Sequence, residues 1–153
     1  MEPDHASGVA QVLTRYPECT LVTTALAQAM IGQFFEGVDI SDRVITAAEG
    51  DTLTVGAHTL AFVEAPMVHW PEVMVTFDAT TGILFSADAF GCFGALDGNM
   101  YADQVNFKEK WLDEARRYYC NIVGKYGPQV QDVLAKASTL DISMLCSTHG
   151  PIW

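Results

Sequence analysis

The sequence predicts an α/β fold in which β-sheets and helices pack as the layers of a sandwich. Short apolar, β-type runs alternate with helix-type segments along all 153 residues, without internal repeats or low-complexity linkers. Hydrophobic residues make up 50% of the chain and charged residues 18%, which is enough apolar material for one globular core. We therefore expect residues 1–153 to belong to one domain.

The first part of the chain reads as helix, strand and helix. Residues 7–16 predict a short helix that is closed by Pro17, and residues 19–23 predict a short strand. A second helix fits residues 25–35 and ends at Gly37, a residue type that favours helix ends. These segments predict a helix-rich entry into the sheet.

The middle of the chain is a series of β-type runs separated by turn residues: 43–46, 52–55, 59–63, 73–77 and 83–85. Gly50, Gly56 and Gly82 lie in the turns, where glycine adopts a positive φ at little cost. We expect hairpins to connect these strands.

The last part of the chain returns to helices and ends on a strand. Asn106 or Asp103 is positioned to cap a long helix that runs to about Val123. Its large and apolar residues recur at helical spacing: Trp111, Ala115, Tyr118, Tyr119 and Ile122. A last helix fits residues 129–137, and residues 142–145 predict a short buried strand.

Charge and cysteine content exclude several functions. The formal net charge is −11, from 19 acidic against 8 basic residues, so no basic surface is expected for nucleic acid. Neither a signal peptide nor an apolar run of membrane-spanning length is found, and we expect a cytoplasmic protein without a membrane segment. The cysteines form no C-x-x-C pair and are expected to be reduced thiols: Cys19, Cys92, Cys120 and Cys146.

Ligand-type side chains lie in the segment before the first predicted helix or just after a predicted strand: Glu2, Asp4, His5, His69, Asp88 and His149. Loops that follow several strands can converge on one rim of a sheet, where rigid strands position them. Taken singly, each residue has a simpler explanation. Glu2 and Asp4 suit a helix N-terminus, His69 a turn, and Asp88 a turn cap. Taken together, they predict a two-metal site.

The order of these residues resembles the diiron domain of flavodiiron proteins, which belong to the metallo-β-lactamase-fold superfamily. The matching segments are Glu2-Pro3-Asp4-His5, residues 67–71 around His69, residues 84–91 around Asp88, and residues 147–153 around His149. Hydrolases of this superfamily carry H-x-H-x-D-H, whereas the flavodiiron branch carries H-x-E-x-D-H, and Glu2 stands at the exchanged position. A carboxylate is a harder ligand than imidazole, which favours iron over zinc.

The resemblance implies a metallo-β-lactamase-like αββα four-layer fold, incomplete here because the family's N-terminal strands precede Glu2. It implies two non-haem irons bridged by Asp88, with Glu2 and His69 on one iron and Asp4, His5 and His149 on the other. The family's remaining ligand is a histidine two residues before Glu2, a position that would precede Met1. We therefore expect either a gene fragment or an open reading frame whose start was assigned at an internal methionine.

The resemblance also implies an oxidoreductase that reduces dioxygen to water or nitric oxide to nitrous oxide. The electrons would come from FMN in a flavodoxin-like domain outside these residues, supplied by rubredoxin or by a flavin or NADH reductase. Relatives pair head to tail, so that the FMN of one subunit serves the irons of the other. Trp70 and Trp153 flank two ligand loops, and we expect them either to lie behind the ligands or to face that flavin.

Two other functional classes stay open. A hydrolase of the same fold would use a metal-bound hydroxide on an ester, thioester or amide, and Glu2 argues against it. The second class is a non-catalytic fragment or one half of a split protein. Outside the ligand set, His58 is expected to be a solvent-facing strand residue. Tyr118 and Tyr119 are expected in the core, with a hydroxyl that reaches the metals as the alternative.

Overall fold

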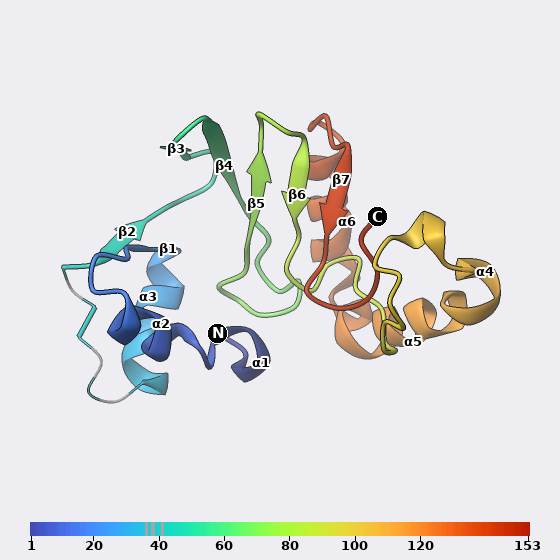
Figure 1. The fold of residues 1–153 in the computed structure, drawn as a ribbon, viewed down its shortest axis with the longest axis horizontal. Coiled ribbons are helices and arrows are strands. Elements are labelled where there is room, and N and C mark those ends of the chain that lie inside the picture. Colours follow the sequence, from blue (N-terminus) through green and yellow to red (C-terminus); the bar gives the residue numbers. More distant parts are fainter. Residues whose placement is uncertain (36, 38, 41) are drawn as a thin grey trace.

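The computed structural model describes residues 1–35, 37, 39–40 and 42–153. Figure 1 shows a five-stranded sheet with the C-terminal helices beside it, and a smaller N-terminal part made of short helices and a two-stranded sheet. Within the described residues, no helix is long and apolar enough to cross a membrane. The predicted mixture of strands and helices is confirmed.

The larger sheet has the strand order β3-β4-β5-β6-β7. Its strands are β3 (Thr52–Val55), β4 (His58–Glu64), β5 (Met74–Asp78), β6 (Ile83–Phe85) and β7 (Met144–Cys146). Neighbours from β3 to β6 are antiparallel, as hairpins require, and Gly82 takes a φ of 72° in the β5–β6 turn. The last strand, β7, pairs with β6 in parallel, which the long helical connection between them permits.

The smaller sheet corrects one prediction. β1 (Leu21–Thr23) pairs in parallel with β2 (Val44–Thr46), so residues 43–46 do not form a hairpin with the next strand. The helix α3 (Ala25–Phe34) lies between β1 and β2, and such a crossover is what a parallel pair needs. Its first turn is capped by Thr24, whose hydroxyl accepts a hydrogen bond from the Ala27 amide at 3.2 Å.

A short helix that was not predicted precedes the first predicted one. α1 (Pro3–Ala6) precedes α2 (Val9–Arg15), and the Gly8 N-cap separates them. Asp4 and His5 therefore lie in a helical turn rather than in the loop expected before the helix. Pro3 explains the early start, because its fixed φ and missing N–H suit the first position of a helix.

The C-terminal helices differ from the prediction mainly in their ends. The long helix expected from Asp103 or Asn106 is interrupted at Trp111, which separates α4 (Phe107–Lys110) from α5 (Leu112–Ile122). The remaining elements are two short 3-10 helices and α6: Ala102–Gln104, Gly124–Tyr126 and Gly127–Ala137. The last strand begins at Met144, two residues after the predicted start, because residues 142 and 143 lie outside the ladder.

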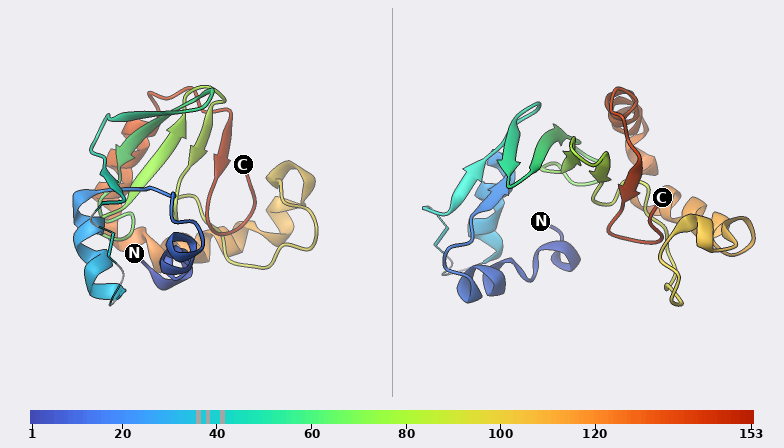
Figure 2. Two further views of the ribbon diagram at one scale, coloured as in Figure 1. Left: turned by 60° about the vertical axis from the view of Figure 1, so that its left-hand side comes forward. Right: turned by 45° about the horizontal axis from the view of Figure 1, so that its top comes forward.

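Two separate apolar cores stabilise the molecule. The larger one joins the sheet to α6 and the segment after α5: Ala65, Val68, Val75, Phe77, Leu84, Ala89, Val123 and Val133. The turned views show α6 against one face of the sheet (Figure 2). The smaller core, made by Leu13, Ile31 and Ile40, belongs to the N-terminal part. Burial of such side chains is the main favourable contribution to folding.

His58 begins β4 and is half exposed, as expected for a solvent-facing strand residue. Its Nδ1 lies 2.7 Å from Oδ2 of the buried Asp78, which also accepts a 2.6 Å hydrogen bond from the Thr81 hydroxyl. The Thr81 hydrogen bond holds the pKa of Asp78 below its ordinary value; burial opposes this effect, and the contacts with His58 and the Thr80 amide add to it. This group closes the end of the sheet opposite the ligand loops.

The Leu84→Ala substitution should lower the free energy of unfolding by about 2–5 kcal/mol, because Leu84 is 2% exposed and its removal leaves a cavity in the larger core. The neighbouring Phe85 is 49% exposed, and Phe85→Ala should cost much less. Urea unfolding of the two variants makes the comparison. Equal losses would show that the larger core does not lie where these burials place it.

The Asp78→Asn substitution should reduce the acid sensitivity of the fold. Since the folded-state pKa of Asp78 is lowered, its carboxylate stabilises the protein above the unfolded pKa of about 4, and this contribution is lost as the pH falls through the folded pKa. Unfolding midpoints measured from about pH 6 to pH 3 should therefore fall less steeply in the variant. Asp132→Asn, at an exposed position, should keep the wild-type slope.

Candidate metal centre

All six predicted ligand residues meet at one end of the larger sheet. They form two groups, Asp4 with His5 and His149, and Glu2 with His69 and Asp88, and the potential ligand atoms within each group all lie within 4.8 Å of one another. Four segments supply them: the segment around α1, the β4–β5 loop, the loop that follows β6 and the loop that follows β7. Residues far apart in sequence thus form one cluster.

The group of Glu2, His69 and Asp88 is the less exposed of the two, with Asp88 buried and the other two side chains partly exposed. Nε2 of His69 lies 2.9 Å from Oε2 of Glu2 and 3.3 Å from Oδ2 of Asp88. The β4–β5 loop that carries His69 is closed by two backbone hydrogen bonds, from the Ala65 amide to Val73 and from the Met67 amide to Trp70, each 2.8 Å long. The imidazole is therefore presented by a loop whose two ends are fixed.

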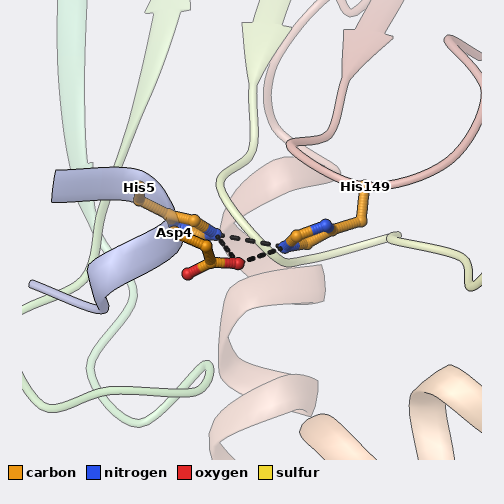
Figure 3. A group of neighbouring side chains, drawn as sticks. All are labelled: Asp4, His5 and His149. Atoms are coloured by element: carbon orange, nitrogen blue, oxygen red, sulfur yellow. Dashed lines mark hydrogen bonds and ion pairs between the residues drawn. The ribbon is translucent and has the colours of Figure 1, made fainter. Parts of the chain in front are cut away.

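The second group is more open to solvent. The Nε2 atoms of His5 and His149 lie 3.1 Å apart, and Oδ2 of Asp4 lies 3.4 Å from the former and 3.2 Å from the latter. Figure 3 shows the three side chains converging from α1 and from the loop after β7. Two ring nitrogens and a carboxylate oxygen that face one point are a donor set for a cation.

Asp88 links the two groups. Its Oδ2 is the atom near His69, whereas Oδ1 lies 3.2 Å from Nε2 of His5 and 3.3 Å from Nε2 of His149. The carboxylate is buried, and the hydroxyls of Tyr118 and Thr148 each donate to Oδ1 at 3.1 Å. Asp88 thus directs one oxygen to each group from a fixed position.

Hydrogen bonds from the loop after β7 fix the conformation of the loop after β6. Ala87 takes a left-handed φ of 51°, and its carbonyl accepts hydrogen bonds from the Thr148 amide at 2.9 Å and the Ser147 hydroxyl at 3.1 Å. The Cys92 amide donates to the His149 carbonyl at 3.1 Å. These bonds hold Asp88 and His149 in one unit.

Helical spacing alone left open whether the hydroxyl of Tyr118 reaches the metal site. Tyr118 is 3% exposed, as expected for a core residue, and its hydroxyl also reaches Asp88. Burial, followed by the nearby Asp88 charge, raises the pKa of Tyr118 far above its ordinary value, so the hydroxyl stays protonated. The same prediction is wrong for Tyr119, which is 44% exposed, because successive helical residues point about 100° apart.

Two further residues at the site were missed from the sequence. Thr148 precedes the ligand His149, and Glu72 follows His69, Trp70 and Pro71; both positions could have been noticed as polar neighbours of ligands. Trp70 lines a cavity with Glu2 and Asp88, and its ring centroid lies 6.3 Å from that of Phe34. Its expected contact with a flavin stays a prediction.

The donor set fits a pair of transition-metal ions. Three carboxylates lie beside three imidazoles, and no Lys or Arg side chain among the described residues forms an ion pair with Glu2, Asp4 or Asp88. Like charges at such short range repel, and cations relieve that repulsion. Mixed nitrogen and oxygen donors suit iron as well as zinc, with the three carboxylates favouring the harder ion.

Curated proteins resemble this chain along its whole length. Residues 1–150 match the model of the ODP family beta lactamase. An anaerobic nitric oxide reductase flavorubredoxin of Salmonella typhi is 31% identical over 99% of this chain and 32% of its own length. An uncharacterized protein of Methanocaldococcus jannaschii is 30% identical over 100% of this chain and 37% of its own. The chain spans about a third of such curated relatives.

Two solved structures superpose closely. The rubredoxin oxygen:oxidoreductase from Desulfovibrio gigas has a TM-score of 0.88 at 30% identity, over 97% of this chain and 37% of that one. A flavoprotein from Thermotoga maritima has a TM-score of 0.87 at 27% identity, over 99% of this chain and 36% of that one. The metallo-β-lactamase-like fold expected from the sequence is thereby confirmed.

Gly150→Ala should destabilise the protein more than Gly98→Ala. Both glycines have a positive φ, of 88° and 112°, but an added Cβ at Gly150 would lie 2.6 Å from Cβ of Cys92, whereas nothing lies within 4 Å at Gly98. Backbone strain alone should cost about 1 kcal/mol, and the clash should add about 1–3 kcal/mol. Urea unfolding checks the difference, and equal costs would contradict the close approach of the two loops.

Proposed function

Because the chain belongs to the ODP family of β-lactamase-like proteins and matches flavodiiron proteins along its length, we propose that it carries the diiron site of a flavodiiron oxidoreductase. The proposed reaction is reduction of dioxygen to water, of nitric oxide to nitrous oxide, or of both. A relative named as a nitric oxide reductase and one named as a rubredoxin:oxygen oxidoreductase support these two substrates.

The observation that carries the proposal is the position of Asp88 between two groups of nitrogen and oxygen donors. In the assignment we propose, Glu2 and His69 would hold one iron, Asp4, His5 and His149 would hold the second, and Asp88 would serve both. A bound pair of irons would supply the redox chemistry that reduction of dioxygen or nitric oxide needs.

The chain's own residues orient the ligands and hold a proton. The Thr148 and Tyr118 hydroxyls fix the Asp88 carboxylate, and the Tyr118 hydroxyl keeps its proton beside Oδ1. On its other side, Tyr118 lines an apolar cavity together with residues such as Val68 and Ala89. A hydrogen-bonded ligand with few alternative conformations lowers the entropic cost of binding metal.

The partners of the reaction are also part of the proposal. FMN would be bound by a domain outside these residues and would supply the electrons, with rubredoxin or a flavin or NADH reductase as donor. A head-to-tail homodimer would bring that FMN to the irons, with Trp70 facing it. The names of two relatives, a flavorubredoxin and a rubredoxin oxygen:oxidoreductase, support the donor class. We propose a cytoplasmic location.

The test is metal stoichiometry followed by reactivity. Under anaerobic conditions the chain should bind two ferrous ions, and reduced protein should then consume dioxygen or nitric oxide. Asp88→Asn should weaken iron binding at least about tenfold, because the amide loses the charge and one of the two acceptor oxygens that face the groups. Asp97→Asn, at an exposed position, is the matched control.

Two outcomes would overturn the proposal. Zinc binding with turnover of a chromogenic ester would indicate a hydrolase of the same fold. A folded chain that binds no iron would indicate a non-catalytic fragment, or a half that needs a second segment.

A further inference from the structure

An apolar cavity lies between the helices α5 and α6 and the loop after β6. Its volume is about 270 Å³, and its walls include Ala115 of α5 and Val130 and Val133 of α6. In the part of the chain that the structure describes, none of its lining residues carries a formal charge. A ligand of this cavity would therefore be held by apolar contacts and not by ion pairs.

The cavity has a buried inner end and an exposed mouth. Val68, Tyr118 and Val133, which form the inner end, are all buried. Phe90 and Leu134, which form the mouth, are both exposed although their side chains are large and apolar. The lining thus extends from the solvent to the interior of the larger core.

The inner end adjoins the metal ligands. Val68 precedes His69 and Ala89 follows Asp88, so two lining residues are sequence neighbours of ligands. Tyr118 lines the cavity, and its hydroxyl donates to Oδ1 of Asp88 at 3.1 Å. A single side chain therefore spans the distance from the cavity to the carboxylate that faces both ligand groups.

We propose that this cavity binds dioxygen and nitric oxide and holds them beside the metal centre. This inference rests on the proposed diiron function and adds to it a substrate site outside the ligand set. Both molecules are small and uncharged, so apolar surroundings favour them over water. The volume of about 270 Å³ exceeds the roughly 150 Å³ of an engineered apolar cavity that binds benzene or xenon.

Other occupants fit the cavity less well. A buried water needs about two to four polar partners, and the Tyr118 hydroxyl already donates its hydrogen to Asp88. A charged ligand would lose its hydration without gaining an oppositely charged partner. An apolar protein partner would explain the exposed mouth but not the buried space behind it.

The first experiment locates dissolved dioxygen by methyl NMR of the whole chain without metal. Dioxygen is paramagnetic, so it accelerates the relaxation of methyl groups near the places where it resides. Under oxygen pressure, the methyl groups of Val68, Ala89 and Val133 should gain at least about threefold more relaxation than those of the exposed Val12. Xenon should shift the same three sets of signals.

Equal relaxation at Val12 and at the inner end would overturn the proposal. An effect confined to Leu134 at the mouth would also overturn it, because that result would indicate a surface groove for a larger partner.

A variant that fills the cavity tests the assignment. Ala115→Leu adds apolar volume to the cavity wall and should remove most of the excess relaxation at Val68 and Val133. Ala135→Leu makes the same change at an exposed position of α6 and should keep the wild-type result. Should Ala115→Leu fail to fold, the wild-type relaxation and xenon shifts decide alone.

Reactivity tests whether the cavity supplies the centre. In single turnovers of the reduced, iron-loaded chain, Ala115→Leu should raise the half-saturating dioxygen concentration about threefold and leave the maximal rate unchanged. An unchanged half-saturating concentration, together with lost relaxation, would show an isolated void and overturn the proposal. If the chain binds no iron, the diiron function is wrong, whereas the NMR experiment still decides whether the cavity binds dioxygen.

Discussion

The Asp88 carboxylate is the point on which the site depends. It is buried, it receives hydroxyl donors from α5 and from the loop after β7, and its two oxygens face different groups of ligands. The neighbouring loops are shaped to deliver it, since Ala87 accepts its backbone partners in a left-handed conformation. The conformation of the loops after β6 and β7 therefore determines the geometry of the whole metal centre.

The charge of the centre explains why its donors come from separate elements. Glu2, Asp4 and Asp88 repel one another, and in the described residues only imidazoles lie between them. Repulsion of this kind costs little when the charges are apart, as in the unfolded chain, and becomes large when they meet. Metal binding and the docking of the α1 segment on the sheet are thus thermodynamically linked, because a cation relieves the repulsion only in the docked form.

Local signals predicted most of the fold and the membership of the ligand set. Gly82 and its neighbours specify the hairpin turns, and ligand types after strand ends converge because strands fix their ends. The features that the sequence did not predict depend on tertiary contacts. The parallel pairing of Val22 with Ile45 requires α3 as a crossover, and the choice of Tyr118 over Tyr119 for the interior depends on which face of α5 meets the ligand loops. Glu72 carries no local pattern at all, and only its burial marks it.

The existence of two cores has a consequence for the metal ligands. Leu13, Ile31 and Ile40 share no residue with the larger core, yet the N-terminal part contributes Glu2, Asp4 and His5, whereas the larger sheet contributes the other three. The two halves of the site are thus joined by the chain but stabilised by different cores. The effective concentration of one half at the other depends on the stability of the smaller core. Residues that contact no ligand therefore change the metal affinity, because they change the fraction of molecules in which both halves of the site are in place.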